Sequence, residues 1–222
     1  MVKPHGSRGR EAGRVVGALA LAGALALAAA IPASAWTQIY NSYPYDPLSC
    51  GDPGGYCIEW PTTPGGLSVN VDVYLYASLG QANIDLRTDV RRTYNYWNDI
   101  PARNPHLQET TSLSASEVDV WRGTTIYPDS WAETTPYPQP GGGHTMTYAT
   151  MVFNSLVTWN RSYNYGTYTA DARKVAMHEM GHVEALGHTG INPAVMRQGA
   201  LSYSVPQYND RIGIVAIYGA YP

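Results

Sequence analysis

The segment HEMGHVEALGH, at residues 178–188, is the stretch from which the rest of the sequence is best interpreted. It holds three of the six histidines of the 222-residue chain. On a helix, residues four apart lie one above the other, so the imidazoles of His178 and His182 would converge on one point. Imidazole nitrogens suit Zn²⁺, and three protein ligands leave a fourth position for water. We therefore predict one zinc ion, bound by His178, His182 and His188.

Two glutamates lie within this segment, and we expect different roles for them. Glu179 follows the first histidine and lies about 100° further round the helix. Its carboxylate can therefore reach the water at the fourth position without binding the metal. We interpret Glu184 as a solvated helix residue rather than a second catalytic acid. An isolated His-Glu-x-x-His pattern also occurs by chance, and the third histidine is what strengthens the metal prediction.

The first 35 residues have the pattern of a secretory signal peptide. Four basic residues precede an apolar run at 15–31, and Ala33-Ser34-Ala35 offers the small residues that a signal peptidase accepts. The run is long enough to cross a bilayer, so a retained membrane anchor is the alternative. We expect cleavage after Ala35, export to the extracellular space, and no stable membrane association afterwards.

The remaining chain, from Trp36 to Pro222, is mildly acidic. It keeps ten Lys and Arg against sixteen Asp and Glu, a formal net charge of −6. Nucleic acids and anionic membrane surfaces require a basic face, so we exclude them as partners. We expect a monomer.

Residues 36–66 are dense in Pro, Gly and Tyr and predict an irregular N-terminal segment. Cys50 and Cys57 both lie in it. In an exported protein, such a pair most often forms a local disulfide. The alternative is a free thiolate that binds the zinc ion and keeps the protein latent.

Regular structure is expected over residues 67–222, which we assign to one α+β domain with strands and three helices. Period-2 alternation predicts strands, helical spacing and capping residues predict helices, and Pro- and Gly-rich stretches predict loops. These patterns place a strand at 69–76, a helix at 83–98, a short strand near Val118 and Val120, a loop at 136–143 and a β-rich run at 145–154. A second helix is expected from Ala170, capped by Thr169. The last helix is expected to have a capping box at Ser204 and Gln207 and to end at Gly219.

The histidine segment resembles the metzincin signature His-Glu-x-x-His-x-x-Gly-x-x-His. Met196, eight residues after His188, resembles the Met-turn of that clan, although an ordinary core methionine is the alternative. Pro206–Gly219 is similar to the C-terminal helix of matrixins, and Thr189 is close to the serine usual after the third histidine. The resemblance is strong over Thr169–Tyr218 and weaker over Val69–Asn154.

The resemblance implies a zincin-like catalytic domain with a twisted mixed sheet, about three helices and a zinc cleft. It implies a secreted zinc metalloendopeptidase that hydrolyses protein or peptide substrates, with Glu179 as the general base. By the same analogy, an edge strand within Thr145–Asn154 would pair with the substrate. The alternatives are a catalytically inactive secreted protein that binds zinc, and a non-peptide amide hydrolase.

The sequence departs from the matrixin pattern in the turn after the second histidine. Ala185 stands where the signature has glycine, and a positive φ there would cost on the order of 1–2 kcal/mol. The other possibility is that the helix continues further and turns at Gly187. We also expect no long inhibitory pro-region of the matrixin type. No motif supports a Ca²⁺ site, and we interpret His144 as a surface histidine rather than a ligand of a second metal.

Overall fold

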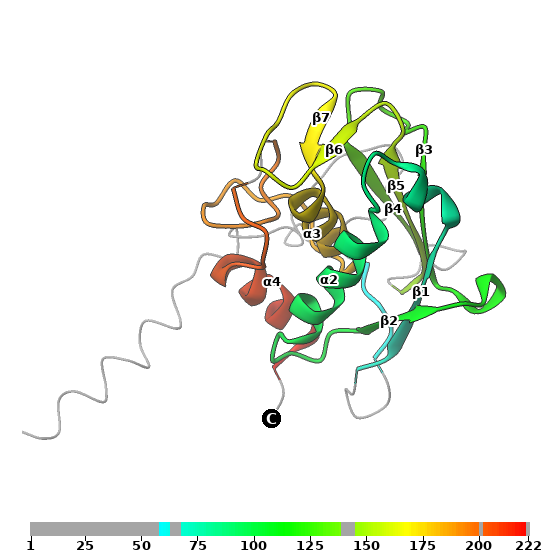
Figure 1. Cartoon of the computed structure of the whole chain (residues 1–222). Coiled ribbons are helices and arrows are strands. Elements are labelled where there is room, and N and C mark those ends of the chain that lie inside the picture. The colour runs from blue at the N-terminus through cyan, green and yellow to red at the C-terminus, as the bar shows by residue number, and fades with distance from the viewer. Residues whose placement is uncertain (1–57, 63–67, 139–144, 200–201, 221–222) are drawn as a thin grey trace, which may run out of the picture. The chain divides into compact units, whose positions relative to one another are not determined.

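Five strands form a mixed sheet in the order β2-β1-β3-β5-β4 (Figure 1). The computed structural model describes residues 58–62, 68–138, 145–199 and 202–220. In chain order the strands are β1 (Asn70–Leu75), β2 (His106–Thr110), β3 (Val118–Gly123), β4 (Ala132–Pro138) and β5 (Met146–Asn154). The first three and β5 pair in parallel, whereas β4 runs antiparallel to β5 at the edge.

The alternation that predicted a strand at 69–76 is confirmed by β1. Val71 and Val73 are buried, whereas Asn70 is exposed and Tyr74 is half-buried. A period of two places alternate side chains on opposite faces of a sheet, so the two valines enter the core together.

The edge of the sheet differs from the prediction. A strand does cover Met146–Asn154, but β5 lies between β3 and β4, so the prediction that it is the edge strand was wrong. The edge strand is β4, whose last residues fall in the predicted loop at 136–143. Proline cannot donate a ladder hydrogen bond, and Pro136 is tolerated because an edge strand has one unpaired side.

In the part of the chain that the structure describes, three α-helices accompany the sheet, so the α+β prediction is confirmed. Figure 1 shows α2 and α3 side by side, and Trp97 joins them by donating its indole hydrogen to the carbonyl of Met177 at 3.3 Å. Trp97 is fully buried. The helices are α2 (Arg87–Asn98), α3 (Ala172–Val183) and α4 (Tyr208–Tyr218). Two 3₁₀ turns are η2 (Ala77–Gln81) and η3 (Leu113–Ala115). A second, two-stranded sheet pairs β6 (Thr158–Asn160) with β7 (Thr169–Asp171).

The helix expected over 83–98 begins later, at Arg87. Asn83 instead binds the backbone of β6: its amide donates to the carbonyl of Trp159 at 2.6 Å and its carbonyl accepts from the Trp159 amide at 2.9 Å. These long-range hydrogen bonds hold Asn83 outside the helix, which begins at Arg87.

Two predicted caps lie at different residues. Thr169 belongs to β7, and the cap of α3 is Asp171, whose side chain accepts a hydrogen bond from the Arg173 amide at 3.0 Å. In α4 the capping box joins Gln207 and Asp210 rather than Ser204 and Gln207. The predicted end of this helix at Gly219 is confirmed, with a φ of 80°.

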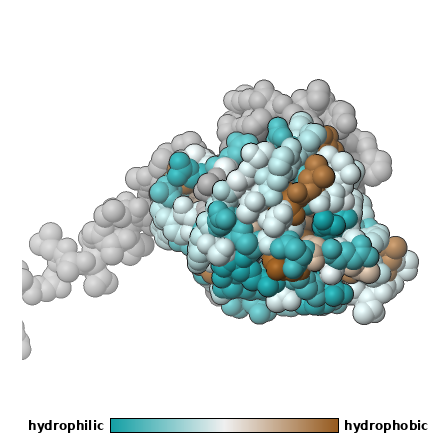
Figure 2. Space-filling model, turned by 45° about the horizontal axis from the view of Figure 1, so that its top comes forward, coloured by the Kyte–Doolittle hydropathy of each residue, from teal (hydrophilic) through white to brown (hydrophobic). Residues whose placement is uncertain are grey.

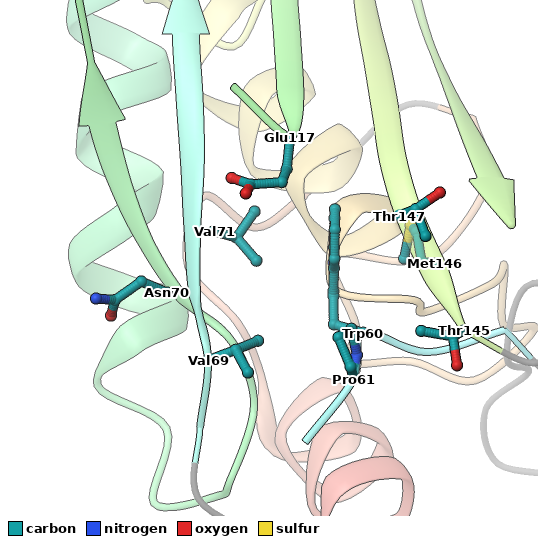
Figure 3. Close-up of a pocket in the computed structure, with 9 residues that line it drawn as sticks. All are labelled: Trp60, Pro61, Val69, Asn70, Val71, Glu117, Thr145, Met146 and Thr147. Atoms are coloured by element: carbon teal, nitrogen blue, oxygen red, sulfur yellow. The ribbon is translucent and has the colours of Figure 1, made fainter. Parts of the chain in front are cut away.

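The described residues 58–62 lie against the sheet between β1 and β5. Because β3 begins opposite Val73, no described strand lies between the first residues of β1 and the first residues of β5. Glu59 bridges to Thr145 there, and Figure 3 shows Trp60 between Val71 and Met146. A shallow pocket remains at this place, lined by Trp60, Pro61, Val69, Asn70, Val71, Glu117, Thr145, Met146 and Thr147.

On the face shown in Figure 2, hydrophobic residues form only small, separate patches among neutral and hydrophilic ones. Within the described ranges, no helix has the length and apolar character needed to span a membrane. The predicted signal peptide at residues 1–35, both cysteines and His144 lie outside the described residues. The cleavage site, the disulfide and the proposed domain boundaries therefore stay predictions.

Candidate metal centre

Helix α3 positions two of the three histidines and Glu179. It runs for twelve residues from its Asp171 cap, and most of its side chains are buried. His178 and His182 are one helical period apart, and their ring centroids lie 4.8 Å from each other. The predicted convergence of these two side chains is therefore observed.

The chain turns back immediately after the helix. The Leu186 amide donates to the Gly181 carbonyl at 2.9 Å and the Ala185 amide to the His182 carbonyl at 3.0 Å. This pair of bonds is a Schellman motif, which requires a left-handed residue after the cap. That residue is Ala185, with a φ of 68°, while the φ of Gly187 is not positive. The helix therefore turns at Ala185, and the alternative turn at Gly187 is wrong.

This turn brings His188 to the other two histidines. Its ring centroid lies 5.2 Å from that of His178 and 4.9 Å from that of His182. One nitrogen from each of the three histidines lies within 4.8 Å of the others. The Nε2 atoms of His178 and His188 are 3.2 Å apart, close to the roughly 3.3 Å expected between two nitrogens that bind one tetrahedral zinc ion.

Backbone carbonyls orient two of the rings. Nδ1 of His178 lies 2.7 Å from the carbonyl oxygen of Val195, and Nδ1 of His182 lies 2.7 Å from that of Leu186. A carbonyl oxygen only accepts, so each Nδ1 carries a proton and each Nε2 of a neutral ring is left with its lone pair. Burial lowers the pKa of His178 to about 4 and also lowers the pKa values of His182 and His188. Neutral imidazoles with free Nε2 atoms are what a metal ion requires.

Met196 packs against α3 at Gly181. A β-carbon built on Gly181 would lie 2.2 Å from the Met196 sulfur, so glycine is needed for this close approach. Met196 is almost fully buried. The side chain of Asp210, on α4, accepts hydrogen bonds from the amides of Val195 and Met196 at 2.9 and 3.2 Å. Helix α4 thereby holds the same segment whose carbonyl orients His178.

Glu179 faces the edge strand. Its side chain is only 6% exposed, and Thr134 on β4 donates a hydrogen bond to its Oε2 at 2.8 Å. Burial raises the pKa of Glu179 to about 7, and the hydrogen bond from Thr134 opposes that shift. The sequence offered no signal for Thr134, because it lies 45 residues before Glu179 in a stretch that lacks a clear strand pattern.

Glu184 is not solvated, so that part of the prediction was wrong. Its side chain is fully buried, and burial raises its pKa to about 8. Asn104 donates to its Oε2 at 3.3 Å, while Oε1 accepts no hydrogen bond from any of the described residues. Glu184 is also the C-cap of α3, and Tyr218 of α4 donates a hydrogen bond to its main-chain carbonyl at 3.4 Å.

None of these residues lines the pocket in Figure 3, so that pocket and the histidine cluster are separate places on the molecule. No family model matches the chain, and no curated protein matches it either. The geometry therefore carries the argument by itself. His178, His182 and His188 form a cluster that could hold a metal ion, which is consistent with a zinc-binding protein.

Proposed function

We propose that this chain is a secreted zinc endopeptidase of the metzincin type, most similar to the matrixins. The observation that carries the proposal is the arrangement at α3. Three histidine nitrogens converge, and the adjacent Glu179 carboxylate is held by the strand at the edge of the sheet. Binding a zinc ion needs only the histidines, so a positioned carboxylate beside them favours hydrolysis over a structural metal site.

Other contacts support the likeness to matrixins. Met196 lies against the helix that carries two of the histidines, in the position implied for a Met-turn. Helix α4 binds that turn through Asp210, and the mixed sheet with three helices agrees with the implied fold. Ala185 adopts the left-handed conformation for which the family signature uses glycine. The turn is therefore built in the expected way with a less favourable residue.

A bound zinc ion would acidify a water molecule and polarise the scissile carbonyl. Glu179 would accept the proton of that water and pass it to the leaving amine. A carboxyl whose pKa lies near neutrality is suited to both steps. The side of β4 that pairs with no strand among the described residues would bind an extended peptide by main-chain hydrogen bonds, next to the strand residue that contacts Glu179.

The test is cleavage of a diverse peptide library by the purified chain with zinc bound, in parallel with the Glu179→Gln variant. We expect wild-type cleavage that a chelator abolishes and added zinc restores, about one zinc per chain in both proteins, and no cleavage by the variant. Zinc bound without any cleavage would favour the inactive zinc-binding protein. Hydrolysis of simple amides but not of peptides would favour the non-peptide hydrolase.

A further inference from the structure

We propose that Thr134 is a positioning residue for the general base: its hydroxyl fixes one oxygen of the Glu179 carboxylate from the edge strand. This inference rests on the proposed function, because it assigns the residue that orients the proton acceptor of that same site.

The contact itself is specific. Oγ1 of Thr134 lies 2.8 Å from Oε2 of Glu179 and 3.1 Å from the Glu179 carbonyl oxygen. A hydroxyl donates a single hydrogen, and the shorter contact is to the carboxylate. A hydrogen bond to an ionised group in a site shielded from bulk solvent is stronger than one between neutral groups. Glu179 is nearly inaccessible, so the contact is in such a site.

The strand holds the donor in place. Thr134 pairs with Met151, within the run of paired residues that joins β4 to β5, so its backbone is fixed by the ladder. With Oε2 bound, rotation of the carboxylate is restricted and the position of the second oxygen is set. Correct placement of a catalytic group contributes substantially to rate, and a small displacement is costly. In the proposed enzyme, β4 would also hold the substrate, so one strand would position both the base and the peptide.

The neighbouring threonine provides a matched control. Thr135 is also half-buried on β4, but successive residues of a strand point to opposite faces, so its side chain lies on the other face of the sheet. Thr134→Val and Thr135→Val remove the same hydroxyl with the same change in shape. Only the first removes the hydrogen bond to Glu179.

The experiment compares wild type, Thr134→Val, Thr134→Ser and Thr135→Val as full chains loaded with zinc. We expect Thr134→Val to lower kcat by about 10- to 100-fold, the loss of one hydrogen bond to a charged group, with KM changed by less than about threefold. Thr134→Ser keeps the hydroxyl and should recover most of kcat. Thr135→Val changes a side chain on the other face of β4 and leaves the contact with Glu179 intact, so it should lose far less kcat than Thr134→Val. Metal content and the thermal unfolding midpoint are measured for each protein.

A second measurement does not depend on turnover. Acetohydroxamic acid chelates zinc through two oxygens and transfers its proton to a neighbouring base, so its affinity reports the placement of Glu179. Calorimetric titration should show weaker binding to Thr134→Val, by about tenfold, and recovery in Thr134→Ser. If wild type binds zinc but cleaves nothing, the proposed function fails, and this titration still decides whether Thr134 orients Glu179. The inference is overturned if Thr134→Val keeps kcat and acetohydroxamate affinity within twofold of wild type, or if Thr134→Ser is as impaired as Thr134→Val.

Discussion

Glu179 and Glu184 lie five positions apart at helix α3 and are almost equally inaccessible, yet they contact different parts of the molecule. Glu179 meets Thr134 on the edge strand, beside the histidine cluster. Glu184 meets Asn104, in the connection between α2 and β2. Burial raises the pKa of both carboxyls, to about 7 and about 8. A raised pKa therefore does not distinguish a catalytic base from a buried structural acid, and the neighbouring groups do.

The largest expected effect separates the two glutamates by activity. Glu179→Gln should lower kcat/KM by at least 100-fold and up to about 10⁴-fold, because a general base contributes that much. Glu184→Gln should keep kcat/KM within about threefold of wild type. Peptide hydrolysis and zinc content of both variants give the answer. Equal losses of kcat/KM at matched zinc content would contradict the assignment of Glu179, rather than Glu184, as the general base.

The second prediction concerns stability against pH. The pKa of Glu184 in the folded chain is about 8, well above the ordinary value of 4.5, so the folded state keeps a proton that the unfolded chain releases. The resulting stabilisation is present at low pH and is lost as pH rises through 8. We expect the free energy of unfolding of wild type to fall by about 1.4 kcal/mol per pH unit between pH 6 and 8 relative to Glu184→Gln. Urea unfolding in excess zinc measures both curves, and parallel curves would contradict the assignment.

The third prediction tests the close packing of Met196 against Gly181 on α3. Gly181→Ala would place a methyl group 2.2 Å from the Met196 sulfur and 3.0 Å from the Trp97 ring. We expect a loss of about 1–3 kcal/mol in the free energy of unfolding, as for other overpacked cores. Gly190→Ala is the control, since nothing lies within 4 Å of its new methyl group. An equal change in the free energy of unfolding of the two variants would contradict this, because it would mean that the Met196 side chain moves aside without cost.

The smallest effect concerns the turn at Ala185, which follows Glu184 and leads to His188. Ala185→Gly relieves a left-handed alanine, and Ala176→Gly removes a methyl group that is equally buried but lies within the helix. Each variant loses one fully buried methyl group. We expect Ala185→Gly to be more stable than Ala176→Gly by about 1–2 kcal/mol, the cost of the left-handed conformation. Thermal unfolding of the two variants would refute this if their midpoints coincide.

Elements with a strong local pattern could be predicted, and those that depend on distant partners could not. The alternation of β1 and the histidine spacing of α3 are repeated within a few residues, so they identify a strand and a helix directly. The strand β4 was missed because Pro136 and its neighbours resemble a loop, and only the edge position makes them acceptable in a strand. The start of α2 was misplaced because Asn83 binds a residue 76 positions away.

The same division holds within the candidate site. The sequence alone determined that His178, His182 and Glu179 share one helix and that His188 must return to them, because helical geometry is local. Only the tertiary structure decided that Val195 and Leu186 orient the rings, that Thr134 holds Glu179, and that Glu184 is buried. Each of these depends on how separate segments pack against α3. Packing is set by the whole core, so no short pattern in the chain can specify it.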